Sequence, residues 1–184
     1  MPTPRQWRRA FTGVASAALL PTFVLGACIA TDIRINVSSS YPLGLYRAKP
    51  VNGARPDQKG LFFALCLPSS PQLDLARERD YLGPGRCPSG ARPLFKQLLA
   101  VPGDRVDAVA GGLAVNGGEA LPNSKSSAID GEGRSMRIWH GGPVPEDNGV
   151  FLSTHSPASF DSRYLGPLPL SAATDVLQPL WLWN

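Results

Sequence analysis

A long charge-free segment near the N-terminus limits where this chain can reside and how it can fold. It extends from residue 10 to residue 30 and follows a short segment that contains three arginines and no acidic residue. About 20 apolar residues suffice to cross the hydrocarbon core of a bilayer as a helix. Positive charge before such a span favours a cytoplasmic N-terminus. We therefore predict three regions: a cytoplasmic segment at 1–9, a single transmembrane helix at 10–30 and an exported domain at 31–184.

Two other interpretations of this segment stay open. Leu25-Gly26-Ala27-Cys28 resembles a lipoprotein signal box, in which a lipid on Cys28 would tether the domain. A cleaved secretory signal is the other, although the apolar region is longer than usual and Cys28-Ile29-Ala30 is a poor cleavage site. All three interpretations export the domain. We expect a single-pass protein of a bacterial inner membrane whose main domain lies in the periplasm.

The exported domain has the composition of a turn-rich β protein. The chain contains 19 glycines and 19 prolines among 184 residues, which disfavours long helices. Its hydrophobic content of 43% excludes a disordered chain. The net charge of +4 comes mostly from the N-terminal arginines, so we do not expect nucleic-acid binding.

Apolar runs bounded by turn residues predict the strands of a mainly β fold. Ser70 and Pro71 are a good N-cap and first position for one short helix, which we expect to end by Gly83. The apolar residues 179–183 favour a buried strand over a membrane-touching edge. The expected strands are 60–67, 94–101, a hairpin at 105–116 centred on Gly111-Gly112, 150–152 and 176–183.

Two cysteines of the exported domain, Cys66 and Cys87, could form a disulfide in an oxidising compartment. The sequence contains no CxxC motif and no cluster of cysteine and histidine. We therefore expect neither a metal site nor a cofactor.

Lys96 lies in an unusual place for a lysine. In a strand over 94–101 it shares a face with Leu94, Leu98 and Ala100. Burial disfavours the ammonium form and lowers the pKa of a lysine, which allows it to act as a general base. The alternative is a lysine at a sheet edge whose amine reaches the solvent.

A run of three serines, Ser38 to Ser40, precedes a Pro-x-Gly turn just after the predicted anchor. A nucleophilic serine needs a partner that removes its proton. The chain has only two histidines, so a serine–lysine dyad with Lys96 is the simpler arrangement. The alternative is a polar linker.

A third polar segment, SFDSRYLG, begins at Ser159. Asp161 and Arg163 are spaced to lie on one face of an extended chain and to form an ion pair, and Ser159 could orient a lysine amine. Taken alone, this segment could also be a polar loop.

Together these segments resemble the type I signal peptidase family, the Ser–Lys peptidases of group S26. The order is a membrane anchor, the serine box SSSYPLGLY, the lysine box LFKQLLAVPGDRV and the box SFDSRYLG. The lysine box matches the family pattern K-x-x-x-(G/A)-x-P-G-D. The serine box is similar to that of the conjugative transfer signal peptidases of the TraF type. One departure is Ser153-Thr154-His155, where leader peptidases usually carry Gly-Asp-Asn.

The resemblance implies a signal-peptidase-type β fold and assigns roles within it. Ser40 would be the nucleophile and Lys96 the general base. The Ser38 hydroxyl and the Ser40 backbone N–H would form the oxyanion hole. Ser159 would orient Lys96, and Asp161 and Arg163 would form a structural ion pair.

The resemblance also implies a class of substrate: exported precursors with small residues at the first and third positions before the cut. In the conjugative branch the substrate is a pilin precursor, and an amine can replace water and join the pilin ends into a ring. A housekeeping signal peptidase is the main alternative. A non-enzymatic periplasmic assembly factor of a conjugation or type IV secretion channel is a second alternative.

Overall fold

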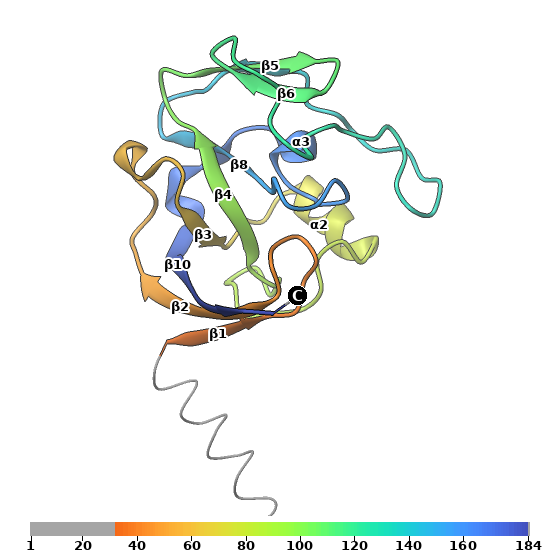
Figure 1. Ribbon diagram of the computed structural model, residues 1–184. Coiled ribbons are helices and arrows are strands. Elements are labelled where there is room, and N and C mark those ends of the chain that lie inside the picture. Colours follow the sequence, from red (N-terminus) through yellow and green to blue (C-terminus); the bar gives the residue numbers. More distant parts are fainter. Residues whose placement is uncertain (1–31, 184) are drawn as a thin grey trace, which may run out of the picture.

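The computed structural model describes residues 32–183, which form two antiparallel β-sheets and two short α-helices (Figure 1). The helices are α2 (Pro71–Glu78) and α3 (Ser162–Leu165), and single 3-10 turns occur at Pro56–Gln58 and Leu170–Ala172. The larger sheet has the order β1 (Ile33–Asn36), β2 (Gly44–Pro50), β10 (Ala173–Leu182), β3 (Phe62–Leu65), β4 (Leu94–Ala100), β8 (Asn148–Leu152) and β9 (Leu168–Pro169). The smaller sheet has the order β6 (Gly112–Val115), β5 (Arg105–Val109) and β7 (Gly141–Pro143).

The predicted transmembrane helix at 10–30, the segment 1–9 and Cys28 all lie outside the described residues. Between residues 32 and 183, the structure contains no helix that is long and apolar enough to cross a membrane.

Strand β4 carries the predicted lysine through the middle of the larger sheet (Figure 1). Its side chains alternate between buried and half-buried positions, as a period of two requires. Leu94, Lys96, Leu98 and Ala100 are the buried set. Lys96 lies opposite Phe63 of β3, so the lysine belongs to the interior of the domain.

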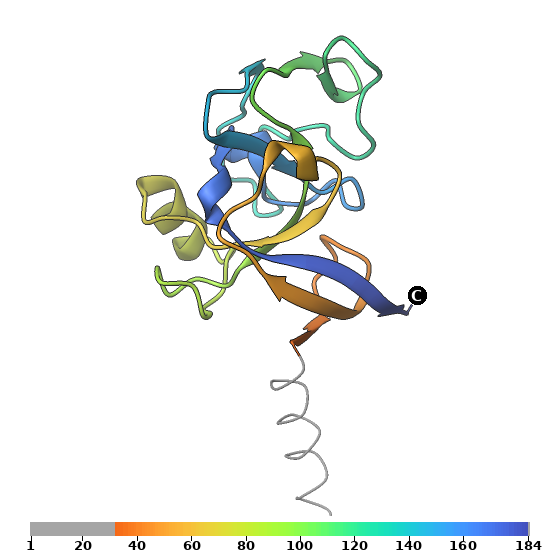
Figure 2. The same ribbon diagram turned by 90° about the vertical axis from the view of Figure 1, so that its left-hand side faces the viewer.

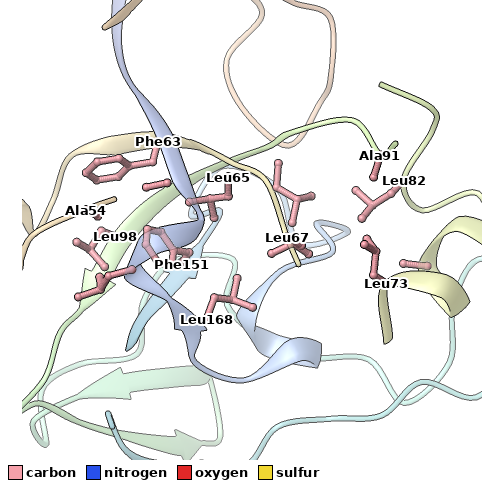
Figure 3. Close-up of a cluster of buried hydrophobic side chains, with 14 of the residues drawn as sticks. Ala54, Phe63, Leu65, Leu67, Leu73, Leu82, Ala91, Leu98, Phe151 and Leu168 are labelled. Atoms are coloured by element: carbon pink, nitrogen blue, oxygen red, sulfur yellow. The ribbon is translucent and has the colours of Figure 1, made fainter. Parts of the chain in front are cut away.

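The main core lies between α2 and the larger sheet (Figure 3). Phe63 and Phe151 meet edge to face with ring centroids 6.0 Å apart. On the helix side, Leu73 of α2 packs with Leu82 and Ala91. A second cluster joins β8 to the smaller sheet; its buried members are Ala100, Val106, Leu113, Val144, Val150 and Leu152.

Helix α2 begins where the sequence predicts. The Ser70 side chain accepts a hydrogen bond from the Leu73 backbone N–H at 3.2 Å, and Pro71 occupies the first turn. The helix ends at Glu78, before the expected stop at Gly83, because Asp80 adopts a left-handed conformation with φ of 58°.

The expectation of a single helix is wrong, because α3 is a second one. It is four residues long, which is too short to show a helical period in the sequence. Its N-cap is Asp161, whose carboxylate accepts a hydrogen bond from the Arg163 backbone N–H at 3.1 Å.

The expectation of a buried C-terminal strand is also wrong in part. Strand β10 continues to Leu182 and pairs there with β2, but Trp181 is 69% exposed and Trp183 is 39% exposed. Figure 2 shows the end of β10 extending beside β2, away from the smaller sheet. Hydrogen bonding therefore orders this segment, while its apolar side chains remain in contact with solvent.

A disulfide after β3 and a hydrogen-bonded turn after β4 stabilise the strands that carry the candidate site. Cys66, just after β3, forms a disulfide with Cys87, which lies in the segment between α2 and β4. At the far end of β4, the Pro-Gly-Asp part of the lysine box forms a turn in which Gly103 has φ of 90°. The Asp104 carboxylate accepts hydrogen bonds from the Val101 N–H at 2.9 Å and the Lys59 amine at 2.8 Å. These hydrogen bonds stabilise the turn that connects β4 to β5.

Candidate active site

The predicted nucleophile lies in the loop 37–43 between β1 and β2, and Asn36 shapes this loop. Asn36 is buried, and its side-chain amide donates hydrogen bonds of 3.1 Å to the carbonyls of Ser38, Tyr41 and Pro42. Its amide oxygen accepts the Ser38 N–H at 3.1 Å. One side chain therefore fixes the backbone on both sides of Ser40.

Tyr41, the residue after Ser40, attaches the loop to the core. Its ring lies edge-on to Phe62 with centroids 4.4 Å apart. Burial raises the pKa of its phenol, so the ring is a neutral, packed group. Tyr46 adds a hydrogen bond from its hydroxyl to the Pro42 carbonyl at 2.7 Å. Packed aromatic rings therefore hold the loop that carries Ser40.

Two serines from the other end of the chain contact Ser40. The Ser159 hydroxyl donates a hydrogen bond to Ser40 Oγ at 3.3 Å. Ser159 thus contacts the predicted nucleophile, whereas the resemblance predicts that it orients Lys96. The Ser153 hydroxyl donates to the Ser40 carbonyl oxygen. Both serines are buried. The side chain and the backbone of Ser40 are thus each positioned by a hydroxyl.

The two predicted oxyanion donors are adjacent. The Ser40 backbone N–H donates to Ser38 Oγ at 3.3 Å. Ser38 and Ser39 are exposed, whereas Ser40 is half-buried. An oxyanion placed between the Ser40 N–H and the Ser38 hydroxyl would replace this long internal hydrogen bond with two shorter ones.

Lys96 is 2% exposed and lines the same cavity as Ser40. Burial lowers the pKa of its amine from the ordinary value of 10.5 to about 8. The negative charge of Asp161 acts against this shift, and the positive charge of Arg163 adds to it. A buried amine with such a pKa is neutral in a substantial fraction of molecules at mildly alkaline pH, which is what a general base requires.

Asp161 and Arg163 form a fully buried ion pair. The guanidinium donates to both carboxylate oxygens, at 2.9 and 2.7 Å. Arg163 also donates to the carbonyls of Pro157 and Ser156, at 3.0 and 3.2 Å. Asp161 accepts the Ser153 N–H at 3.0 Å. The pair therefore folds the segment 153–161 that presents Ser153 and Ser159 to Ser40.

The cavity at this site has a volume of about 780 Å³. Its walls come from β1, the loop 37–43, the start of β4 and the segment 80–86. Ser38, Ser40 and Lys96 all face it. A space of this size accommodates several residues of an extended peptide beside the serine and the lysine.

Sequence reasoning missed two residues of the site. Asn36 carried no signal, because a single asparagine before a serine run is common in loops. Ser153 was visible only as a departure from the Gly-Asp-Asn pattern. In the part of the chain that the structure describes, no three side chains of histidine, cysteine, aspartate or glutamate gather as metal ligands would.

The amino-acid sequence is similar to those of known proteins. Residues 6–181 match the family described as signal peptidase, peptidase S26. A probable conjugal transfer protein TraF of Sinorhizobium fredii is 36% identical over 175 residues, covering 95% of this chain and 90% of that protein. A plasmid transfer protein TraF of Escherichia coli is 32% identical over 178 residues, covering 96% of this chain and 97% of that protein.

One solved structure, a signal peptidase I from Enterococcus faecalis, is also similar. It aligns at 19% identity with a TM-score of 0.39, covering 68% of this chain and 98% of that chain. The family match and the sequence relatives extend over nearly the whole chain and include all the boxes of the site. The chain therefore belongs to the signal peptidase family, peptidase S26, and is related within it to the conjugal transfer proteins TraF.

Proposed function

We propose that this protein is a serine endopeptidase of conjugative transfer that cleaves a pilin precursor with a Ser40–Lys96 dyad. One observation carries the proposal: a serine held by two neighbouring hydroxyls and a buried lysine with a lowered pKa line the same cavity. The S26 family supports the peptidase class, and the names of the relatives support the role in conjugation.

The acylation step needs only these groups. Neutral Lys96 takes the proton of the Ser40 hydroxyl while Ser40 Oγ attacks the carbonyl carbon of the scissile bond. Because Ser40 Oγ already accepts a hydrogen bond from Ser159, its own proton remains free for the lysine. The oxyanion that forms is stabilised by the Ser40 N–H and the Ser38 hydroxyl. The Lys96 ammonium then protonates the leaving amine, and an acyl-enzyme remains on Ser40.

Deacylation repeats these steps with a second nucleophile. If Lys96 deprotonates a water molecule, the product is a linear peptide with a free carboxylate. If it deprotonates an amine of the substrate itself, the product is a ring. The two products differ by the mass of one water molecule, so a mass spectrum separates them.

The location in the membrane belongs to the proposal too. We propose that residues 10–30 anchor the protein in the inner membrane and that the domain works in the periplasm. The described chain begins at Asp32 and reaches Ser40 within a few residues, so the cut would fall near the membrane surface. Exported precursors are accessible there.

The test is incubation of the purified full chain with the pilin precursor of its own conjugation system. We expect a defined cut, loss of cleavage in Ser40→Ala, and loss in Lys96→Arg because a guanidinium does not give up its proton at working pH. Cleavage of many unrelated exported precursors at equal rates would instead indicate a housekeeping signal peptidase. No cleavage of any precursor would favour the assembly factor.

A further inference from the structure

A second cavity opens next to the active-site cavity. It has a volume of about 220 Å³ and lies between α2, the segment 135–137 and α3. Most of its lining is apolar and includes Leu75, Ala76, Met136 and Leu165. Leu75, which lines the cavity, is 43% exposed. The volume suits a single large side chain.

Two aromatic residues connect this cavity to the active site. Tyr81 and Phe160 line both cavities, and their ring centroids are 5.1 Å apart. Phe160 also stacks on Tyr164, which lines the second cavity, with centroids 5.9 Å apart. Phe160 follows Ser159, the residue that donates to Ser40 Oγ. A polypeptide bound at Ser40 therefore needs to pass only one aromatic layer to reach the second cavity.

The shared wall is held firmly in place. The Tyr81 hydroxyl donates to the Asp130 carboxylate. Arg134 donates to the same carboxylate at 2.6 Å, and its guanidinium lies 5.6 Å from the centre of the Tyr81 ring. Arg134 also pairs with Glu132 at 2.9 Å. Asp130 and Glu132 are thus both paired with Arg134.

The charge at the second cavity is positive. Arg79 and Arg137 line it, and its lining contains no acidic residue. Arg79 donates one hydrogen bond to the Ser135 carbonyl at 2.8 Å, while Arg137 is exposed. Guanidinium groups at the mouth of an apolar cavity complement a carboxylate that stands beside an apolar side chain.

We propose that this cavity is a second substrate subsite, which binds an apolar side chain that is flanked by a carboxylate in the precursor polypeptide. The inference rests on the proposed function, because its occupant is the polypeptide that Ser40 cleaves. The wall of Tyr81 and Phe160 that this cavity shares with the active-site cavity points to that polypeptide as the occupant, and the two arginines point to the acidic group. The subsite would select precursors by a residue that lies away from the cut.

Met136 offers a direct test, because it lines the cavity and the chain has only two methionines, the other being Met1. The full-length Ser40→Ala protein is labelled with ¹³C-methyl methionine in detergent micelles. It is titrated with the peptide acetyl-Gly-Leu-Asp-Gly-amide and with acetyl-Gly-Gly-Asp-Gly-amide. We expect a saturable shift of the Met136 methyl signal with the leucine peptide and none with the glycine peptide.

Variants locate the binding. In Arg137→Gln we expect at least about threefold weaker binding, because one exposed charge pair is lost. Leu75→Gln should weaken binding similarly by making the cavity polar. Leu61→Gln is the matched control, since Leu61 is also 43% exposed and lines neither cavity. Its binding should equal that of the parent protein.

Several results would overturn the subsite. These are no saturable shift, equal binding in all three variants, a shift that depends on protein concentration alone, or a shift caused by anionic lipid vesicles alone. The last two would assign the cavity to a second copy or to lipid. Because Ser40→Ala cannot turn over substrate, this readout is independent of cleavage. If the wild-type protein cleaves the precursor and the Met136 signal of Ser40→Ala does not shift with the leucine peptide, the subsite is rejected and the proposed function is retained.

Discussion

At the scale of single residues, the candidate site contains a lysine that the fold places among apolar side chains. Lys96 shares the buried face of β4 with Leu94 and Leu98. A charged amine in such a position destabilises the protein, because an ionised group is removed from water. The same burial lowers its pKa to about 8. The free energy of unfolding is therefore lower below about pH 8, where Lys96 is charged in the folded protein, than at higher pH.

Lys96→Met should raise the stability of the protein at pH 7. Between about pH 8 and 10.5 the unfolded chain binds more protons at Lys96 than the folded chain does, so the stability of the wild type rises with pH in that window. The gain of the methionine variant should be about 3 kcal/mol at pH 7 and should shrink as the pH rises through the window. Denaturant unfolding at pH 7, 8.5 and 10 measures it. A variant less stable than wild type at every pH would contradict the burial argument.

The three consecutive serines make the nucleophile assignment testable. Ser40→Ala should abolish cleavage. Ser38→Ala removes one oxyanion donor and should lower kcat by a factor of about 100 or more. Ser39 is exposed, and Ser39→Ala should stay within a few-fold of wild type. Steady-state cleavage of one precursor by the three variants gives the comparison. An inactive Ser39→Ala with an active Ser40→Ala would show that the assignment is off by one residue.

At the scale of elements, sequence reasoning succeeded where a local pattern is strong. The alternation in β4 and the Ser70-Pro71 start of α2 lie where the sequence predicts. The hairpin also forms, with its turn at Ala110-Gly111, one residue before the expected Gly111-Gly112. Strands β1 and β2 were not predicted, because IRIN and GLYRAKP are short and mix charged with apolar residues. Helix α3 depends on the cap at Asp161 more than on any periodicity. Strands β1 and β2 form through their pairing with each other and with β10, which no local pattern encodes.

The loop 37–43 should depend strongly on one amide. Asn36→Ala removes an amide whose two N–H groups are shared among three backbone carbonyls and whose oxygen accepts one backbone N–H. We expect a loss of about 2–4 kcal/mol in the free energy of unfolding, and a fall in kcat beyond the loss of folded protein because Ser40 is no longer positioned. Asn52→Ala is the control, since Asn52 is exposed. Equal stability and activity in both variants would remove Asn36 from the account.

At the scale of the whole molecule, one end of the larger sheet exposes apolar side chains. Ile35 and Val37 are 54% and 76% exposed, and Trp181 and Trp183 are 69% and 39% exposed. The two strands next to this patch, β1 and β10, both pair with β2. Asn36 of β1 and Leu182 of β10 each lie opposite Gly44 of β2. The patch lies directly after the predicted anchor. Its position could not be deduced from the sequence, because it depends on the sheet order.

We expect this patch to rest on the bilayer, since tryptophan favours the membrane interface. The double variant Trp181→Ser with Trp183→Ser should cleave a precursor embedded in lipid vesicles several-fold more slowly, and a soluble peptide at the wild-type rate. Ile129→Ser, at a residue 58% exposed in a distant loop, is the control. Equal slowing with both substrates would mean that the tryptophans act on the fold and not on the membrane.

The pH profile of cleavage tests the Ser40–Lys96 dyad most directly, because the rival base would be a histidine. His155 lies near the site, because its backbone N–H donates to Ser153 Oγ at 3.2 Å. The unperturbed pKa of a histidine side chain is about 6.5. We predict that kcat/KM rises with pH through a group with a pKa of about 8, and that His155→Ala leaves this rise unchanged. A rise near pH 6.5 that disappears in His155→Ala would contradict the dyad.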